Sequence, residues 1–255
     1  MKKVLLVGES WVSSSTHYKG FDQFGSVTFH TGNKRFMEGM TGGDYDVTHM
    51  AAHEAAAEFP TTMDGLLQYD VIILSDIGAN TLLLHPDVWL RGERVANRVN
   101  LLADWTRQGG GLIMIGGYFS FQGIDGKARW HKTAVESALP VTCLSSDDRM
   151  EIPEGCTPVV NIADHPILAG IKGDWPYLLG VNEVKLKDAP DVNLVLSLPE
   201  VQRSLPLLAT GLYGKGRTVA WTSDMSEHWL PPAFLAWDGY DRLFSNMVAW
   251  AGRDI

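Results

Sequence analysis

The segment Val95–Gly117, VANRVNLLADWTRQGGGLIMIGG, indicates the fold class most directly. Val95, Val99, Leu102 and Ala103 recur at helical spacing, and the glycines at 109–111 supply a helix stop. The apolar run Gly111–Gly117 follows at once and is typical of a buried strand. A helix that feeds straight into a strand predicts a βαβ crossover, and therefore a parallel sheet.

The rest of the chain repeats this alternation of short apolar runs and helical patterns. Strands are predicted at Val4–Val7, Asp46–Met50 and Asp70–Asp76, each ending in polar residues. Leu207–Tyr213 and Arg217–Thr222 flank a glycine turn and predict an antiparallel hairpin whose second strand joins the main sheet. The last helix is predicted from apolar residues at gapless helical spacing: Tyr240, Leu243, Phe244, Met247, Val248 and Ala251. We expect an α/β fold with a mainly parallel sheet and helices on both faces.

The domain organisation follows from the absence of an internal repeat, a low-complexity tract or a linker in the sequence. We expect one domain over residues 1–255. The stretch from about 140 to 206 is richer in proline, aspartate and short polar segments, and it predicts an irregular insertion. One or two strands are expected within it, around Asn193–Leu198.

The composition and charge of the chain limit the classes of binding partner that we expect. The 255 residues are 45% hydrophobic and 20% charged, with a formal net charge of −9 and no block of lysine or arginine, so nucleic acid is not an expected partner. No window approaches the roughly 18 apolar residues of a spanning helix, and the first apolar run is too short for a secretory signal, so we expect a cytoplasmic protein without membrane association. Cys143 and Cys156 form no C-x-x-C pair and are interpreted as ordinary thiols.

Candidate site residues lie where the predicted strands end, because ligands of open parallel sheets bind beyond the carboxyl ends of the strands. These strand exits supply, in chain order, Glu9, Ser10, Trp11, Asp76, Asn80, Tyr118, Ser120, Gln122, Asp224, Glu227, His228 and Trp229.

The run Gly116–Ser120 stands where an α/β hydrolase or amidotransferase carries a nucleophile elbow, a sharp turn that projects its central side chain. Here the centre is Tyr118, and a phenol with a pKa near 10 is a poor nucleophile. Ser120, two residues on, is the other candidate nucleophile. In the alternative interpretation the glycines allow close packing of strand and helix, and Tyr118 and Phe119 fill a crevice.

Asp224 and His228 lie four residues apart after the late strand, and such a carboxylate–imidazole pair can orient a general base. They equally fit a histidine at the solvent edge of a tryptophan-rich core. Glu9 follows the first strand directly, where a carboxylate either faces a ligand cleft or caps the next helix.

Metal and nucleotide cofactors are not predicted. His49 and His53, with Glu54, have a spacing that suits a metal on a helix, but His49 falls at a predicted strand end and no third ligand is near. Gly8-Glu9-Ser10-Trp11 follows the first strand in place of a G-x-G-x-x-G motif, and the chain holds no phosphate-binding loop motif.

Several longer stretches carry a family resemblance: Gly8–Trp11, His17–Asp22, Leu74–Thr81, Met114–Gly123, and Ser223-Asp224 with His228-Trp229. Over almost the whole chain the sequence resembles the bacterial "putative glutamine amidotransferase" family of the class I glutamine amidotransferase-like superfamily. The resemblance implies a flavodoxin-like, doubly wound domain. Active superfamily members release ammonia from glutamine with a Cys on the elbow and a His and a Glu after a late strand.

The sequence departs from that pattern at the elbow, where Tyr118 occupies the position of the Cys. His228 or Asp224 would stand near the usual His. Glutamine hydrolysis through a thiol is therefore the least favoured of three hypotheses. The candidate catalytic residues are Glu9, Tyr118, Ser120, Asp224 and His228, and the candidate ligand-binding residues are Ser10, Trp11, His17, Asp76, Asn80, Gly117, Gln122 and Trp229.

Two other hypotheses are favoured over glutamine hydrolysis. In the first, the protein is a hydrolase or lyase that acts on a small polar metabolite with Glu9, Asp224 or His228 as acid and base. In the second, the same pocket binds a small molecule without converting it, and the aromatic surface supports a homo-oligomer. The nine tryptophans make an interface between copies plausible.

Overall fold

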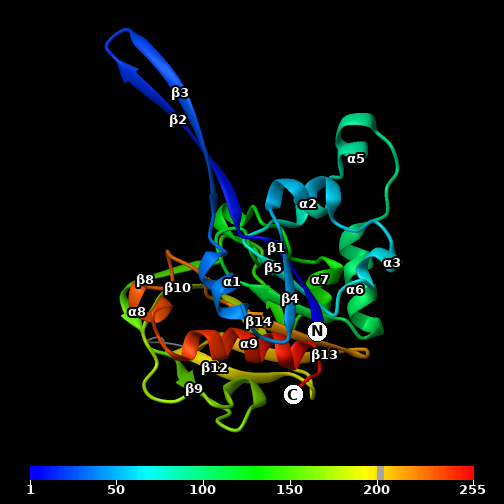
Figure 1. Cartoon of the computed structure of the whole chain (residues 1–255), viewed down its shortest axis with the longest axis vertical. Coiled ribbons are helices and arrows are strands. Elements are labelled where there is room, and N and C mark those ends of the chain that lie inside the picture. The colour runs from blue at the N-terminus through cyan, green and yellow to red at the C-terminus, as the bar shows by residue number, and fades with distance from the viewer. Residues whose placement is uncertain (200–203) are drawn as a thin grey trace.

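The main sheet is built around β1 (Lys2–Gly8), whose central residues Val4–Val7 are fully buried (Figure 1). The computed structural model describes residues 1–199 and 204–255. Strand β1 pairs in parallel with β4 (Tyr45–Met50) on one side and β5 (Val71–Ser75) on the other. The parallel order continues through β6 (Gly111–Ile115) to β14 (Gly216–Trp221). The carboxyl ends of these five strands therefore share one edge of the sheet.

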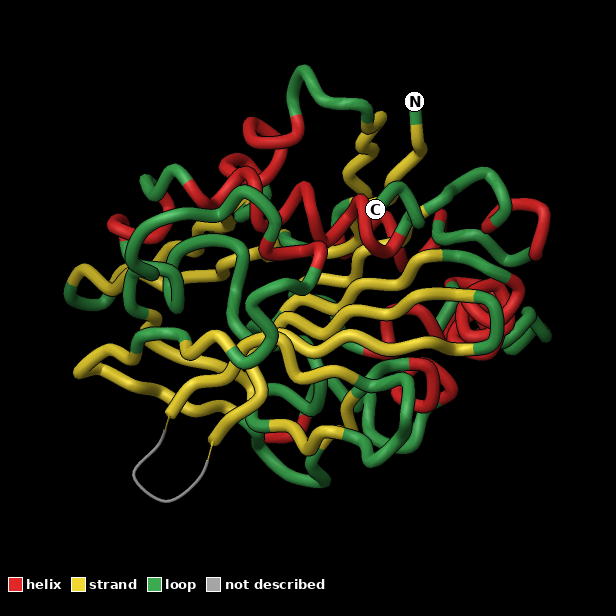
Figure 2. The backbone as a smooth tube through the Cα atoms, turned by 90° about the horizontal axis from the view of Figure 1, so that it is seen from below, coloured by secondary structure: helices red, strands yellow, loops and turns green. Residues whose placement is uncertain are grey.

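Three antiparallel strands extend the sheet beyond β14. They follow in the order β13 (Ser204–Tyr213), β12 (Asn193–Pro199) and β9 (Val159–Val160). Figure 2 shows the long strands of the main sheet side by side from below. The predicted hairpin at 207–222 is confirmed as β13–β14, and its second strand joins the parallel sheet next to β6, as expected.

Helices cover both faces of the sheet because strand residues alternate between two apolar clusters. Val4 and Leu6 of β1 belong to the cluster that packs α1 (Lys34–Met40) and α9 (Gly239–Ala251). Leu5 and Val7 belong to the other cluster. That second cluster packs α2 (Ala52–Glu58), α3 (Met63–Leu66), α4 (Ala79–Leu83), α6 (Arg98–Gln108) and α7 (Ala134–Ala138).

The predicted parallel strands and the last helix are confirmed, with small differences at their ends. Helix α6 begins at Arg98, so the expected inclusion of Val95 is wrong. The reason is local, because the Asn97 side chain accepts hydrogen bonds from the N–H groups of Val99 and Asn100 and so caps the helix at that point.

The stretch 140–206 holds more regular structure than its composition suggests. The expected strand around Asn193–Leu198 is present as β12. In addition, β7 (Val141–Cys143) pairs with β11 (Val184–Leu186), and β8 (Arg149–Cys156) pairs with β10 (Leu178–Asn182). Residues 200–203, inside this stretch, lie outside the described residues.

A long β-hairpin was not predicted. Strands β2 (Ser10–Lys19) and β3 (Asp22–Thr31) form a separate two-stranded sheet that projects from the body (Figure 1). Gly20, at φ +64°, forms part of the tight turn at its tip.

The remaining elements are short. They are α5 (Pro86–Arg91), α8 (Pro232–Leu235), and the 3₁₀ turns η1 (Ile124–Gly126) and η2 (Pro166–Leu168). Among the described residues, no helix has the length and apolar character needed to cross a membrane.

Candidate functional site

A cavity of about 480 Å³ opens at the carboxyl edge of the parallel strands. Its walls come from the segments that follow β1, β5, β6 and β14, which lie far apart in the sequence but end at the same edge. The lining residues are Glu9, Trp11, Asp76, Tyr118, Phe119, Asp224, Ser226, Glu227 and His228. The structure thus brings together six of the predicted site residues.

Glu9 is a buried acidic residue of the cavity, and both of its carboxylate oxygens have hydrogen-bond partners. Its backbone is in the left-handed region, at φ +47°, and its N–H donates to the carbonyl of Ser75 at 2.8 Å. The Ser75 hydroxyl donates to Glu9 Oε2 at 2.6 Å, and the Ser226 hydroxyl donates to Oε1 at 3.0 Å. Burial, followed by the charge of Asp76, raises the pKa of Glu9 to about 7, although the two serine hydrogen bonds act in the opposite direction.

Two further carboxyl groups share this cavity. Asp76 also has a left-handed backbone, at φ +46°, and its Oδ1 accepts from the Phe119 N–H at 2.6 Å. Asp224 Oδ1 accepts from the N–H groups of Met225 and Ser226. Burial raises the pKa of both aspartates, and the charges of Glu9 and Asp76 raise that of Asp224 further. Burial and the neighbouring negative charges therefore favour the protonated form of these carboxyl groups.

Tyr118 and His228 form the opposite wall of the cavity. The Tyr118 hydroxyl donates to Glu151 Oε1 at 3.2 Å and lies 3.2 Å from His228 Nε2. Glu151, from β8, also accepts from Trp229 Nε1 at 3.1 Å. The Arg149 guanidinium lies over the Tyr118 ring, 5.1 Å from its centre. These contacts hold the phenol and the imidazole in fixed positions beside the carboxyl groups.

The turn after β6 does not have the strained geometry of a nucleophile elbow at Tyr118. The positive φ of this turn belongs to Gly117, at +140°, and Tyr118 is outside the left-handed region. Burial and the neighbouring Glu151 raise the pKa of Tyr118, which makes the phenol a still weaker nucleophile. Neither Cys143 nor Cys156 lines the cavity.

Four predicted residues lie behind the cavity wall. Ser120 is buried, donates to the carbonyl of Ile115 and accepts from the Asp76 N–H at 3.0 Å, so its hydroxyl positions Asp76 instead of facing the cavity. Ser10 is also buried and accepts from the Ala52 N–H. Gly117 is hydrogen-bonded to the Asn182 side chain through both its N–H and its carbonyl, and Trp229 is buried.

Three predicted ligand-binding residues lie elsewhere. Asn80 and Gln122 line a separate pocket of about 370 Å³, together with Arg129 and His131. His17 lies on the projecting hairpin, where its ring stacks on Phe24. His17 belongs to the stretch His17–Asp22 that carries the family resemblance, and this stretch forms the distal part of the hairpin.

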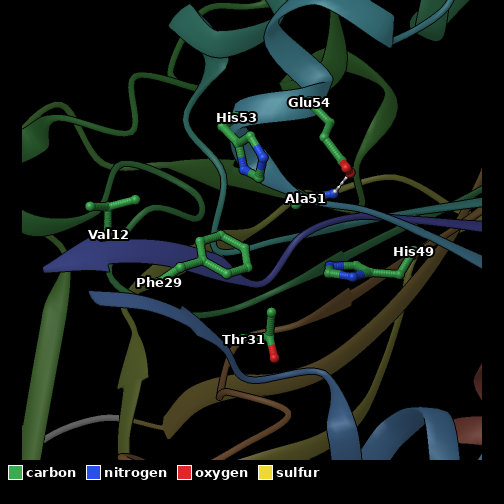
Figure 3. A pocket seen from close by; sticks show the side chains of 7 residues that line it. All are labelled: Val12, Phe29, Thr31, His49, Ala51, His53 and Glu54. Carbon is green, nitrogen blue, oxygen red and sulfur yellow. Dashed lines mark hydrogen bonds between the residues drawn. The ribbon is translucent and has the colours of Figure 1, made fainter. Parts of the chain in front are cut away.

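A pocket of about 710 Å³ lies at the base of the hairpin, and it contains the histidines considered for a metal (Figure 3). His49 Nε2 is 2.8 Å from the Gly8 carbonyl, and the His53 ring meets Phe29 edge-on. Glu54 accepts from the Ala51 N–H and caps α2. Within the described residues, no group of three or more potential metal ligands is found.

The sequence missed the residues that hold the acidic groups. Ser75 directly precedes Asp76, and Ser226 lies between Asp224 and His228 in the sequence. The argument from the strand exits could therefore have included both serines. Gly32 approaches the site with its backbone, since a Cβ there would lie 2.2 Å from Glu9 Oε1. Glu151 comes from β8, inside the stretch predicted to be irregular, and no sequence signal pointed to it.

Comparison with known proteins agrees with this architecture. A family model described as "Putative glutamine amidotransferase" matches residues 3–252. A cytoplasmic protein from Salmonella typhimurium is 37% identical, with a TM-score of 0.92 over 98% of this chain and 99% of the other. A second cytoplasmic protein, from Salmonella typhimurium LT2, is also 37% identical, with a TM-score of 0.91 and the same coverage.

A more distant likeness concerns the fold alone. A β-galactosidase from Bacillus circulans sp. alkalophilus is 10% identical, with a TM-score of 0.51 over 86% of this chain and 26% of the other. The search of curated proteins gave no match.

Proposed function

Because the chain belongs to the family described as "Putative glutamine amidotransferase", we propose that it keeps the family's cavity but uses it for acid–base chemistry without a thiol. In this proposal the protein is a hydrolase or lyase that acts on a small polar metabolite. Glu9 is the general acid or base, Asp224 and His228 assist it, and Tyr118 positions the substrate. Glutamine hydrolysis through a covalent thioester is not part of the proposal, since no cysteine lines the cavity.

The observation that carries the proposal is the environment of Glu9. A general acid or base works best when its pKa lies near the working pH, and burial raises the pKa of Glu9 to about 7. Its two carboxylate oxygens are fixed by Ser75 and Ser226, and its backbone is held in the left-handed region. Strained backbone positions with shifted pKa values are concentrated at functional sites.

The lining of the cavity indicates the class of ligand. Glu9, Asp76, Asp224 and Glu227 supply carboxyl groups, and none of the described residues that line the cavity is a lysine or an arginine. Trp11, Tyr118 and Phe119 supply aromatic surface. A metabolite with amino or hydroxyl groups fits such a lining, because it can donate hydrogen bonds to the carboxyl oxygens and pack on the rings. A phosphorylated or polycarboxylate metabolite fits less well, because its negative charges would face these carboxyl groups.

The proposal also includes the detailed fold type and the cellular location of the protein. The parallel strand order β4–β1–β5–β6–β14 corresponds to the flavodoxin-like order 2-1-3-4-5, which supports a doubly wound fold for this half of the sheet. The similar Salmonella proteins are described as cytoplasmic, which supports a cytoplasmic location for this chain.

The test is a mass-spectrometric depletion screen with an extract of small polar bacterial metabolites, supplemented with glutamine. Wild type, Glu9→Gln and the control Glu58→Gln, an exposed carboxylate on α2, are incubated with it side by side. We expect at least one amine- or hydroxyl-bearing compound to be consumed by wild type and the control but not by Glu9→Gln, and glutamine to persist.

Two results would contradict the proposal. If a compound raises the melting temperature of both wild type and Glu9→Gln and is never converted, the cavity is a binding site and the protein is not an enzyme. If glutamine is converted to glutamate, the expectation derived from the absent thiol is wrong.

A further inference from the structure

The projecting hairpin has almost no support from its own chain. Within the part of the chain that the structure describes, strands β2 and β3 pair only with each other, through ten register pairs from Ser10 with Thr31 to Lys19 with Asp22. Every residue from 14 to 29 is exposed. A two-stranded hairpin is at best marginally stable alone in water, and natural proteins protect free strand edges with proline, charge or bulges. Between residues 10 and 31 the charged residues are Lys19 and Asp22, both at the tip, and there is no proline.

The two faces of the hairpin differ. Directly opposite residues share a face, so one face carries Val12 with Phe29, Ser14 with Val27, Thr16 with Gly25, and Tyr18 with Gln23. We call this the apolar face, because its large side chains Val12, Tyr18, Val27 and Phe29 are mainly apolar and are at least half exposed. On the other face the rings are partnered within the hairpin, since Trp11 stacks on His30, His17 stacks on Phe24, and His17 is hydrogen-bonded to Ser26.

The apolar face has a hollow at one end and projecting rings at the other. At the base, Val12 and Phe29 line the pocket of about 710 Å³ together with His53, as Figure 3 shows. At the tip, Tyr18 and the fully exposed Phe21 project from the hairpin. The hairpin therefore has a pocket at its base and rings at its tip that could fill the same pocket in another copy.

We propose that the apolar face packs against the apolar face of the same hairpin in a second copy of this chain. The two hairpins run antiparallel, so that Tyr18 and Phe21 of each copy fill the pocket at the base of the other. Such a contact is two-fold symmetric, because tip meets base twice.

Size and charge agree with a second copy as the occupant. Ten residues at about 3.4 Å each make a strip about 34 Å long and roughly 10 Å wide. Two such strips and two filled pockets approach the roughly 1,200–2,000 Å² of a stable interface. The chain has a net charge of −9, yet Lys19 and Asp22 cancel within the hairpin, so two hairpins meet without the repulsion that two acidic bodies would suffer.

The first test is light scattering during size-exclusion chromatography, from low to high micromolar concentration. Wild type is expected at twice the chain mass of 28.1 kDa. Tyr18→Ser combined with Val27→Ser should raise the dissociation constant about a hundredfold, because each removes a large apolar contact. The control His17→Ser with Phe24→Ser changes the other face and should remain dimeric. Circular dichroism melting confirms that both variants retain the folded body.

A cross-linking experiment tests the orientation. Ser14→Cys places a thiol at the middle of the apolar face, and Ser13→Cys places one on the other face. With Cys156 replaced by serine, a short bis-maleimide reagent should join two copies through Cys at position 14 and not through Cys at position 13. A monomeric wild type, a dimer unaffected by the apolar-face variant, or equal cross-linking from both faces would overturn the proposal.

Discussion

Among single residues, Glu9 gives the most specific expectation. An unfolded glutamate loses its proton around its usual pKa of 4.5, whereas folded Glu9 holds its proton up to about pH 7. The folded state therefore loses stability as pH rises from about 4.5 to 7, and the loss is complete above that range. At about 1.36 kcal/mol per pKa unit, the difference approaches about 3 kcal/mol.

Glu9→Gln removes this titration, so its free energy of unfolding should fall much less than that of wild type between pH 5 and pH 8. Urea denaturation at both pH values measures it. Parallel pH dependence of the two proteins would show that Glu9 ionises in the folded state as it does in the unfolded chain.

Gly32 lies close to the Glu9 carboxylate with its backbone. A Cβ at this position would lie 2.2 Å from Glu9 Oε1 and 2.8 Å from the Ser226 hydroxyl oxygen. Gly32→Ala should therefore displace the carboxylate, destabilise the fold by about 1–3 kcal/mol and abolish turnover. Gly25→Ala, in the preceding strand β3, is the control, since its Cβ would meet only the Ser15 carbonyl at 3.8 Å. Equal melting temperatures for the two variants would show that Gly32 does not constrain the site.

At the level of elements, Arg98 joins three helices. Its buried guanidinium donates to carbonyls at the ends of α2 and α4, namely those of Ala55, Ala56, Phe59, Thr81 and Leu82. Arg98→Met removes all five of these hydrogen bonds and should cost at least about 3 kcal/mol in urea denaturation. Arg98→Lys should recover only part of the loss, because an ammonium cannot reach five carbonyls in two directions. A methionine variant as stable as wild type would contradict this role.

The elements that could be predicted from sequence are those with a clear apolar period. Strands β1, β5 and β6 are continuous apolar runs, and α9 has an unbroken helical pattern, so local sequence was sufficient. The β2–β3 hairpin lacks a buried face, and the run of serines in β2 interrupts the alternation of apolar and polar residues there. Its strands pair across a tight turn, and the apolar period of a single strand does not reveal such pairing. Within residues 141–186, β7 and β11 have three residues each and β8 has no fully buried residue, so local sequence gives little signal for them.

In the whole molecule, the topology of the sheet brings the main site residues together, because the parallel strands end at one edge. This convergence could therefore be predicted once the parallel strands were assigned, and it involves Glu9, Asp76, Tyr118, Asp224 and His228. The supporting groups were less accessible to sequence reasoning. Glu151 reaches Tyr118 and His228 from β8, an element whose position is set by the tertiary fold alone. His17 lies on the β2–β3 hairpin and outside the cavity, and that hairpin was not predicted from the sequence.

The cysteines give a prediction for the molecule as a whole. Cys143 is buried in the β7 region, burial raises the pKa of its thiol well above the usual range, and Cys156 lies on β8 outside the cavity. Cys143→Ala combined with Cys156→Ser should leave substrate consumption within about twofold of wild type, because a protonated, distant thiol cannot act as nucleophile. Iodoacetamide treatment of wild type provides an independent check, and rapid inactivation by this reagent would indicate a reactive thiol in the site.

The proposal depends above all on Glu9 acting as acid or base in the carboxyl-lined cavity. The decisive experiment is the rate of consumption of the depleted metabolite from pH 5.5 to 8.5, for wild type, Glu9→Gln and the cysteine double variant. For wild type and the cysteine variant, we expect the plot of rate against pH to change slope near pH 7. The rate of Glu9→Gln should be at least about a hundredfold lower than that of wild type and should show no change of slope at that pH. A Glu9→Gln variant that retains the wild-type rate and pH profile would contradict the account.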